Sequence, residues 1–434
     1  MRRNNSGKEP TGKHVMRFAG TFGLLLVLIF GALFCVWRPY SVPGPMMRDF
    51  EAYYAAGATW AAGGDPYSTQ IWNVEKTIPG VDAGRLEVLP FLGPPISLPL
   101  WAFFARFPFD VATKLWGVLL ALAVIVIFAG SFALAGRRMR WSDAPIVVAL
   151  AAAFSPLSNG FSLGQTAPVA TAAMIAALWL LRSGRWPWSG IGSFAALFFK
   201  PNVSLALVGM LRSRSGFLSV ATASIAFAAG NILLGGGPAG IVRYLQALHA
   251  HTLAERWSFI QMTAGSIAFG FGLPGPAAAT CGMLVAAAAV GTLGVVVYRT
   301  RARELEATAL ACTAIPFVSP FLHVHDLLIL FLPAMLCIHR ARGRAWAAGA
   351  IGTVLIATDW VAMTQGKIGA TYDFLVALVM AIEIIALSPA VRAPLRFVPL
   401  VVALLIVPMW FLAPTKGIAL WPDGLPHSFT VALN

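Results

Sequence analysis

Charged side chains are scarce in this sequence. Only 11% of its 434 residues are Asp, Glu, Lys or Arg, whereas 58% are hydrophobic. A soluble domain carries about 25% charged residues, so this chain has too little charged surface to fold as one. The sequence also lacks a Gly-x-x-x-x-Gly-Lys-Ser/Thr loop and an Asp-x-Asp pair. Their absence disfavours enzymes that use ATP or a metal-bound nucleotide sugar.

Cysteine is rare as well, and its positions disfavour two kinds of site. Cys35, Cys281, Cys312 and Cys337 all lie within apolar blocks and are unpaired by spacing. We therefore expect them to pack as small hydrophobic side chains. Neither a disulfide framework nor a zinc site is indicated.

The abundant apolar residues are gathered into blocks. A helix of about 20 apolar residues crosses a hydrocarbon core of about 30 Å. Uncharged blocks of that length are Phe18–Trp37, Leu115–Gly136, Gly216–Gly235 and Pro276–Tyr298. Shorter blocks lie at 91–108, 144–157, 166–181, 189–211, 307–322, 327–338, 345–358, 374–390 and 397–413. Together they predict an all-α polytopic membrane protein with roughly 10 to 13 transmembrane helices.

Basic residues outnumber acidic ones, giving a net charge of +14, and they cluster beside the apolar blocks. Cytoplasmic loops of membrane proteins show this pattern, so membrane lipids rather than nucleic acid are the expected partners. We predict a single transmembrane domain, 1–434, with a cytoplasmic tail at 1–17, a retained first helix, an extracytoplasmic loop at 38–88 and a polar C-terminal tail at 414–434. The clusters lie at 2–17, 137–140, 182–185, 212–214, 299–303 and 340–344.

The long first outer loop, 38–88, is the longest polar connection and is rich in acidic residues. A short helix is predicted over Asp49–Ala62, with Asp49, Tyr53 and Trp60 on one face. Its aromatic side is expected to lie along the membrane interface. Taken alone, Asp49 and Glu51 are equally explained as solvated carboxylates at a helix N-terminus, where negative charge is favoured.

The block 189–211 has basic residues at both ends, which would place both ends in the cytoplasm. Proline interrupts helical hydrogen bonding, so Lys200-Pro201-Asn202 predicts two short arms forming a V with Lys200 near its tip. Irregular backbone at membrane depth is tolerated where it lines a cavity. A cation in that position suits a phosphate, although a lone lysine can also extend to the membrane surface.

A polar segment, Ser319–Asp326, separates two later apolar blocks and contains His323, His325 and Asp326. Histidines two residues apart on a helix point to different faces, and no further His/Cys pair is near in sequence, so a metal site is disfavoured. Hydrogen bonding to a sugar or phosphate is the preferred interpretation, with capping of a helix end as the alternative.

Several motifs occur in the order found in glycosyltransferase family 87, and the chain resembles that family across roughly residues 45–335. They are Asp49-Phe50 with Tyr53–Gly57 and Gly64–Tyr67, Phe91–Pro95 with Leu98-Pro99-Leu100, Gly164-Gln165-Thr166, Phe199–Asn202, and Ser319-Pro320 with His325-Asp326. Gly93, Thr166 and His325 depart from the residues common in the family, which affects the sugar identity more than the reaction type.

The resemblance implies a GT-C fold, a polyprenyl-phosphate-linked sugar as donor, often mannose, and a lipid-linked glycan or glycolipid as acceptor. It also implies a catalytic aspartate in the first outer loop, which corresponds to Asp49. In this interpretation Asp49 is the general base, and the donor phosphate and substrate are bound by Tyr53, Gln165, Lys200, His323, His325 and Asp326. Neither a metal nor another cofactor is required. The site would face the extracytoplasmic side of a bacterial inner membrane.

Two other functions share some of these features. A secondary transporter or lipid-glycan flippase also has broken helices and charges at membrane depth, but no inverted repeat is evident here. A structural scaffold leaves Lys200 unexplained.

Overall fold

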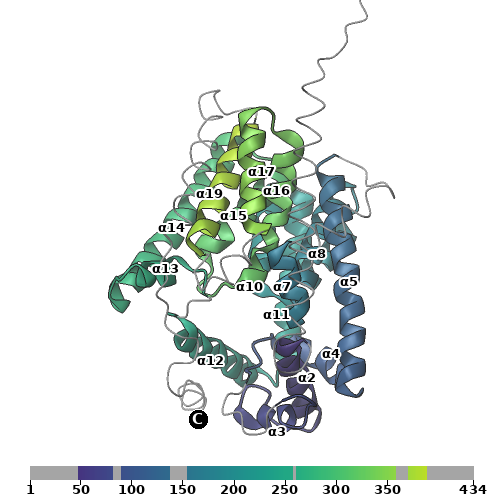
Figure 1. Cartoon of the computed structure of the whole chain (residues 1–434). Coiled ribbons are helices and arrows are strands. Elements are labelled where there is room, and N and C mark those ends of the chain that lie inside the picture. The colour runs from purple at the N-terminus through teal and green to yellow at the C-terminus, as the bar shows by residue number, and fades with distance from the viewer. Residues whose placement is uncertain (1–46, 82–88, 137–153, 258–260, 358–369, 389–434) are drawn as a thin grey trace, which may run out of the picture.

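The computed structural model describes residues 47–81, 89–136, 154–257, 261–357 and 370–388. All regular elements in these ranges are helical, which confirms the predicted all-α class (Figure 1). In chain order they are α2 (Arg48–Ala61), η1 (Thr69–Ile71), α3 (Trp72–Glu75), η2 (Pro95–Ser97), α4 (Leu98–Phe104), α5 (Phe109–Leu134), α7 (Ser155–Leu163), α8 (Ala167–Arg182), α9 (Trp186–Phe199), α10 (Pro201–Ser204), η4 (Leu205–Arg212), α11 (Arg214–Leu234), α12 (Pro238–Glu255), α13 (Ala264–Gly270), α14 (Gly275–Thr300), α15 (Glu304–Val318), η5 (Val324–Leu330), α16 (Phe331–Arg340), α17 (Arg344–Ala357) and α19 (Ala370–Leu387).

Among the described residues, three helices are long and apolar enough to cross a membrane: α5, α11 and α14. They coincide, to within two residues at their C-terminal ends, with three of the four long apolar blocks predicted from the sequence. The fourth block, 18–37, lies outside the described residues, as do the block 397–413 and the tails at 1–17 and 414–434. No residue in the apolar window of α14 is buried, as expected of a helix with one side in lipid. The total of 10 to 13 spans stays a prediction.

A cluster of aromatic rings holds α2 in place at one end of the bundle. The Phe50 ring lies 5.9 Å from the Trp116 ring of α5 and 5.7 Å from the Phe104 ring of α4. Gly57 allows the close approach of α2 to α4, because a Cβ there would lie 2.2 Å from the Trp101 carbonyl carbon. The predicted helix over 49–62 is therefore present, and it packs closely against α4 and α5.

Arginines of three basic clusters that the structure describes, at 212–214, 299–303 and 340–344, lie toward the end of α5 that is opposite α2. Phe109, at the start of α5, contacts Phe50, whereas the carbonyl of Leu134, at its end, accepts a hydrogen bond from Arg340. Arg212 donates to the carbonyl of Ala302, beside the cluster at 299–303. A helix of 26 residues is about 39 Å long. The end of α5 beside α2 and the end beside Arg340 are thus farther apart than the thickness of a hydrocarbon core, which is about 30 Å.

The segment 186–212 forms the predicted V. Its first arm is α9, its second arm is α10 with η4, and the backbone is extended at Lys200 between them (φ −155°, ψ 91°). The carbonyl of Trp186, at the start of the first arm, accepts a hydrogen bond from Ser219 near the start of α11. The second arm leads directly into α11 at Arg214. Both ends therefore lie at the basic end of the bundle, and Lys200 is at the tip.

Candidate active site

Gln165 connects three of the residues predicted to form the site. Its Nε2 donates a hydrogen bond to Oδ2 of Asp49 at 2.5 Å. Its Oε1 accepts from the Tyr53 hydroxyl at 3.2 Å and from the Lys200 ammonium at 3.4 Å. One side-chain amide therefore has a carboxylate at its nitrogen end and a cation at its oxygen end.

The backbone at Gly164 directs Gln165 toward α2. Gly164 ends α7 with φ +72°, and a Cβ there would lie 2.7 Å from the Cβ of Met47 and 2.9 Å from that of Phe50. Both the left-handed conformation and the close contact favour glycine. The Gly164 carbonyl also accepts a 2.8 Å hydrogen bond from the Trp116 indole. The α7–α8 turn is thereby fixed against α2, with Asp49 in the first turn of that helix.

Lys200 forms an ion pair with a second predicted residue, Asp326. Its Nζ lies 2.6 Å from Oδ1 of Asp326, and the two side chains are 14% and 0% exposed. The interpretation of Lys200 as a lone lysine extending to the membrane surface is therefore wrong. Its charge is compensated inside the protein, where pairing offsets the cost of burial.

The segment 323–326 holds the Asp326 carboxylate that pairs with Lys200. Oδ2 of Asp326 accepts a hydrogen bond from the backbone N–H of His323 at 3.1 Å, so Asp326 also caps the start of η5. The His325 ring is buried, with Nε2 3.8 Å from Oδ1 of Asp326. Asp49, Tyr53, Gln165, Lys200 and His323 retain partial exposure, whereas His325 and Asp326 do not. The predicted set thus divides into an accessible layer and a buried supporting layer.

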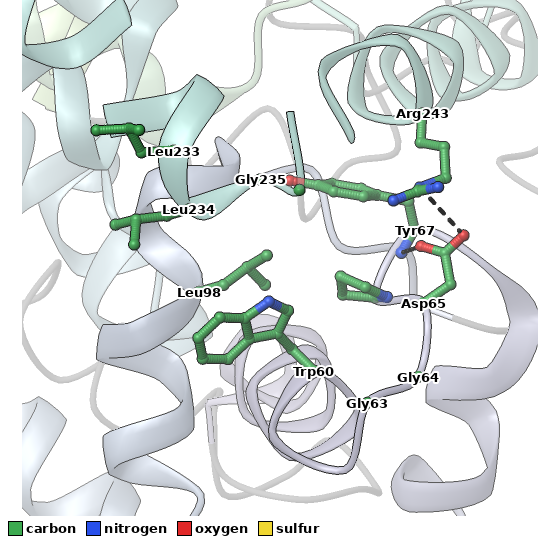
Figure 2. A pocket seen from close by; sticks show the side chains of 12 residues that line it. Trp60, Gly63, Gly64, Asp65, Tyr67, Leu98, Leu233, Leu234, Gly235 and Arg243 are labelled. Atoms are coloured by element: carbon green, nitrogen blue, oxygen red, sulfur yellow. Dashed lines mark hydrogen bonds and ion pairs between the residues drawn. The ribbon is translucent and has the colours of Figure 1, made fainter. Parts of the chain in front are cut away.

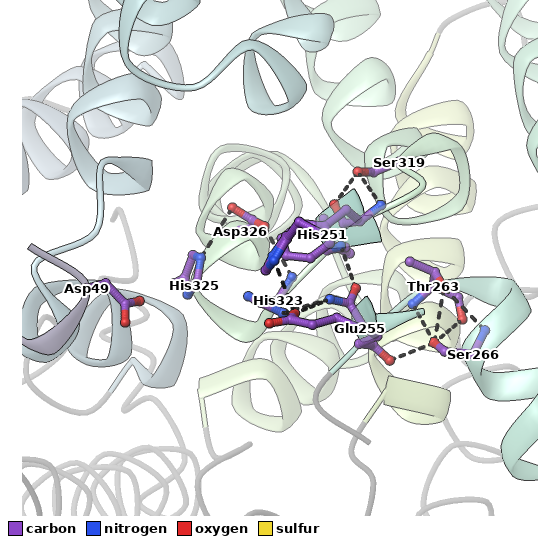
Figure 3. A network of polar contacts seen from close by, with 12 residues as sticks. Asp49, His251, Glu255, Thr263, Ser266, Ser319, His323, His325 and Asp326 are labelled. Carbon is purple, nitrogen blue, oxygen red and sulfur yellow. Dashed lines mark hydrogen bonds and ion pairs between the residues drawn. The ribbon is translucent and has the colours of Figure 1, made fainter. Parts of the chain in front are cut away.

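Glu255 and its neighbours were not predicted from the sequence. Oε2 of Glu255, at the end of α12, lies 3.1 Å from Nε2 of His323 and accepts a hydrogen bond from Gln261 at 3.0 Å (Figure 3). His251, one helical turn earlier, lies 3.6 Å from the same oxygen. The spacing of His251 and Glu255, four residues apart on a helix, was the signal that could have identified this pair.

The Glu255 carboxyl is strongly held in its ionised form. Burial raises its pKa, but His251, His323 and Gln261 together outweigh burial and lower the pKa to about 2. A buried carboxylate with such partners fixes the position of the His323 ring at the edge of the site.

The Asp49 carboxyl has the opposite shift. Burial raises its pKa above the usual 3.8, and the Gln165 hydrogen bond, His323, Arg48 and Lys200 oppose this rise only in part. A carboxylate with a raised pKa is a better proton acceptor near neutral pH than an ordinary one. Glu51, expected as a solvated carboxylate, is fully buried on the other side of α2, so that expectation is wrong.

Metal binding and nucleophilic catalysis by a serine can be tested on the described part of the chain. No group of three or more His, Cys, Asp or Glu side chains within it is arranged to hold a metal ion. Residues 160–164 read Gly-x-Ser-x-Gly, a spacing known from hydrolase nucleophiles. Here, however, Ser162 lies in α7 and donates to the carbonyl of Asn159 in its own helix.

Comparison with known proteins gives one match. Residues 91–320, more than half of the chain, match glycosyltransferase family 87. No curated protein and no solved structure matches. The matched region includes Gln165, Lys200 and Glu255 but neither Asp49 nor His323–Asp326, which are connected to it by the contacts above. The family is one of transferases, which disfavours the transporter and scaffold alternatives. The chain belongs to glycosyltransferase family 87 and is a membrane glycosyltransferase.

Proposed function

We propose that this enzyme transfers a sugar, mannose in the first instance, from a polyprenyl-phosphate donor to a lipid-linked glycan or glycolipid. The observation that carries the proposal is the arrangement of Asp49 and Lys200 at the two ends of the Gln165 amide. Glycosyl transfer from a phosphate needs a base for the acceptor hydroxyl and a positive charge for the departing phosphate. The missing nucleotide motifs and the surrounding apolar helices favour a lipid-borne phosphate over a nucleotide.

In the proposed reaction, Asp49 takes the proton from an acceptor hydroxyl. The hydroxyl oxygen then forms a bond to the anomeric carbon of the donor, and the bond from that carbon to the phosphate oxygen breaks. The electron pair leaves with polyprenyl phosphate. A positioned carboxylate contributes about 10²–10⁴-fold to such a step.

Lys200 is the proposed phosphate-binding group. Asp326 and Gln165 each engage the ammonium, which has three N–H donors. Within the described part of the chain these are its two polar partners, which leaves one N–H for a phosphate oxygen. Asp326 carries negative charge and would repel a phosphate, so we assign it to holding Lys200 in place rather than to binding the donor. His323, which is partly exposed, supplies a further polar contact to the donor, and the buried His325 ring packs against the His323 ring.

The extracytoplasmic position of the site is also part of the proposal. It is supported by the basic clusters at the end of the bundle opposite Asp49. Single cysteines at Ser68 and Ser183, in a cysteine-free background, should react from opposite sides with an impermeant thiol reagent. Reaction of both from one side would contradict the arrangement.

The activity test is incubation of the purified protein with radiolabelled polyprenyl-phosphate-mannose and a lipid extract of its host. Parallel reactions contain polyprenyl-phosphate-glucose or GDP-mannose. Label should enter the lipid fraction from a polyprenyl phosphate without added nucleotide, and should not enter it with Asp49→Asn. Transfer from GDP-mannose alone would refute the proposed donor.

A further inference from the structure

A cavity of about 480 Å³ lies near the other end of α2, away from Asp49 (Figure 2). It is lined by Trp60 of α2, by Asp65 and Tyr67 of the following turn, and by Arg243 of α12. Trp60 follows Asp49 by eleven residues, which is about 16 Å along a helix. The cavity is within the volume range of small-molecule binding sites, and none of its lining residues takes part in the chemistry proposed above.

The polar groups of this cavity form a balanced pair. Nε of Arg243 lies 3.6 Å from Oδ2 of Asp65, and the two side chains remain 49% and 32% exposed. Oδ1 of Asp65 accepts a hydrogen bond from the backbone N–H of Tyr67, which fixes the carboxylate. A cation and an anion side by side favour neither an anionic nor a cationic ligand. They do present donors and acceptors that neighbouring hydroxyl groups can engage together.

The walls of the cavity are suited to a flat ring. The indole of Trp60 faces it (Figure 2), and aromatic faces provide apolar contact with a polar edge. Glycines form much of the remaining wall, and a Cβ at Gly63 would have nothing within 4 Å. The wall is therefore open at Gly63.

One rim of the cavity is apolar and belongs to a helix that is long enough to cross the membrane. Leu233 and Leu234, in the last turn of α11, line the cavity and are 79% and 40% exposed. Exposed leucines at the end of such a helix are suited to contact with lipid. The cavity thus joins a polar compartment to the membrane surface, which suits a ligand with a hydroxyl-rich part and a lipid part.

We propose that this cavity binds sugar units of the lipid-linked acceptor that lie away from the reacting hydroxyl. This inference rests on the proposed function. The separation of about 16 Å along α2 requires an acceptor with more than one sugar unit, since a single sugar cannot occupy both places. Specificity for the acceptor would then depend on Trp60, Asp65 and Arg243, and reaction on Asp49.

The test measures binding without catalysis, on full-length Asp49→Asn protein in nanodiscs. The probes are α-mannotriose, maltotriose and chitotriose, with glycerol 3-phosphate as the probe for a lipid headgroup. We expect saturable binding of at least one trisaccharide. Trp60→Leu and Arg243→Gln should each weaken it at least tenfold. Trp188→Leu, at an exposed tryptophan near the opposite end of the bundle, is the matched control and should leave it unchanged.

Two results would overturn the inference: no trisaccharide binding that depends on Trp60 and Arg243, or binding of glycerol 3-phosphate in its place. In the wild-type protein, the bound trisaccharide should also inhibit transfer by competing with the acceptor and not with the donor; competition with the donor would likewise overturn it. Binding together with failure of every polyprenyl-phosphate reaction would support the cavity and refute the proposed donor, so the two proposals fail separately.

Discussion

The ammonium nitrogen of Lys200 lies 2.6 Å from Oδ1 of Asp326, and this buried ion pair joins two motifs that are far apart in the sequence. The pair changes how a lysine variant must be interpreted. Removing one partner of a buried ion pair leaves an uncompensated charge, which destabilises a protein by about 3–5 kcal/mol. A single substitution of Lys200 therefore tests the fold and the phosphate site together.

We expect Lys200→Met to lower the free energy of unfolding by about 3–5 kcal/mol and to abolish transfer. The double variant Lys200→Met with Asp326→Asn should regain most of the stability, because no charge is then left unpaired, but it should not regain donor binding. Thermal unfolding and donor affinity in nanodiscs measure the two effects. A stable double variant with wild-type transfer would remove Lys200 from the phosphate site.

Asp49→Asn should lower the rate of transfer by about 10²–10⁴-fold, because the amide cannot accept a proton from the acceptor. Donor affinity should change little, since the donor contacts are assigned to other residues. Glu51 is buried and is unsuitable as a control. Asp110→Asn is a better one, because Asp110 is an exposed carboxylate in the first turn of α5 and its side chain pairs with Lys114 on the surface. More than a tenth of wild-type activity in Asp49→Asn would exclude the proposed base.

Much of the fold followed from the apolar blocks and the prolines. Three of the four long blocks correspond to α5, α11 and α14, and the V at Lys200 followed from basic residues at both ends and a proline in the middle. Lys200, Gln165 and Asp326 were predicted separately, but their contacts depend on how α7, α9 and η5 pack, which periodicity does not encode. The spacing of His251 and Glu255 was visible in the sequence, but the contact of Glu255 with His323 is formed only by the tertiary structure.

Glu255→Gln should displace the His323 ring, because a neutral amide holds it less firmly than a carboxylate. A hydrogen bond to a charged group contributes about 1.5–3 kcal/mol. We expect a weaker donor affinity and a slower reaction, while the pH dependence that arises from Asp49 is kept.

Since the folded pKa of Glu255 lies at about 2, below its usual 4.5, its contribution to stability is complete above pH 4.5 and is lost toward pH 2. The wild type, and not the variant, should show this loss in acid unfolding. Unchanged kinetics in the folded variant would make Glu255 purely structural.

Gly57→Ala should separate α2 from α4. The added Cβ would overlap the backbone of Trp101, and overpacking of this kind costs about 1–3 kcal/mol. Because Asp49 is on the same helix, transfer should fall as well. Gly294→Ala is the matched control, since a Cβ at that helical glycine meets nothing within 4 Å. Alanine is the better helix former, so the control should be neutral or slightly stabilising. Equal stability of both variants would contradict the close packing.

The pH dependence of transfer tests Asp49 most directly. Burial raises the pKa of its carboxyl above 3.8, so the group is protonated, and inactive as a base, at a higher pH than an ordinary aspartate. The value of kcat/KM should therefore fall as the pH decreases, with an acidic limb above pH 3.8. The Gln165 hydrogen bond lowers this pKa, and Gln165→Leu should move the limb to higher pH, whatever its effect on the maximal rate. Asp110→Asn should leave the limb in place. A limb that stays fixed in Gln165→Leu, or that moves to lower pH, would mean that the titrating group is not Asp49.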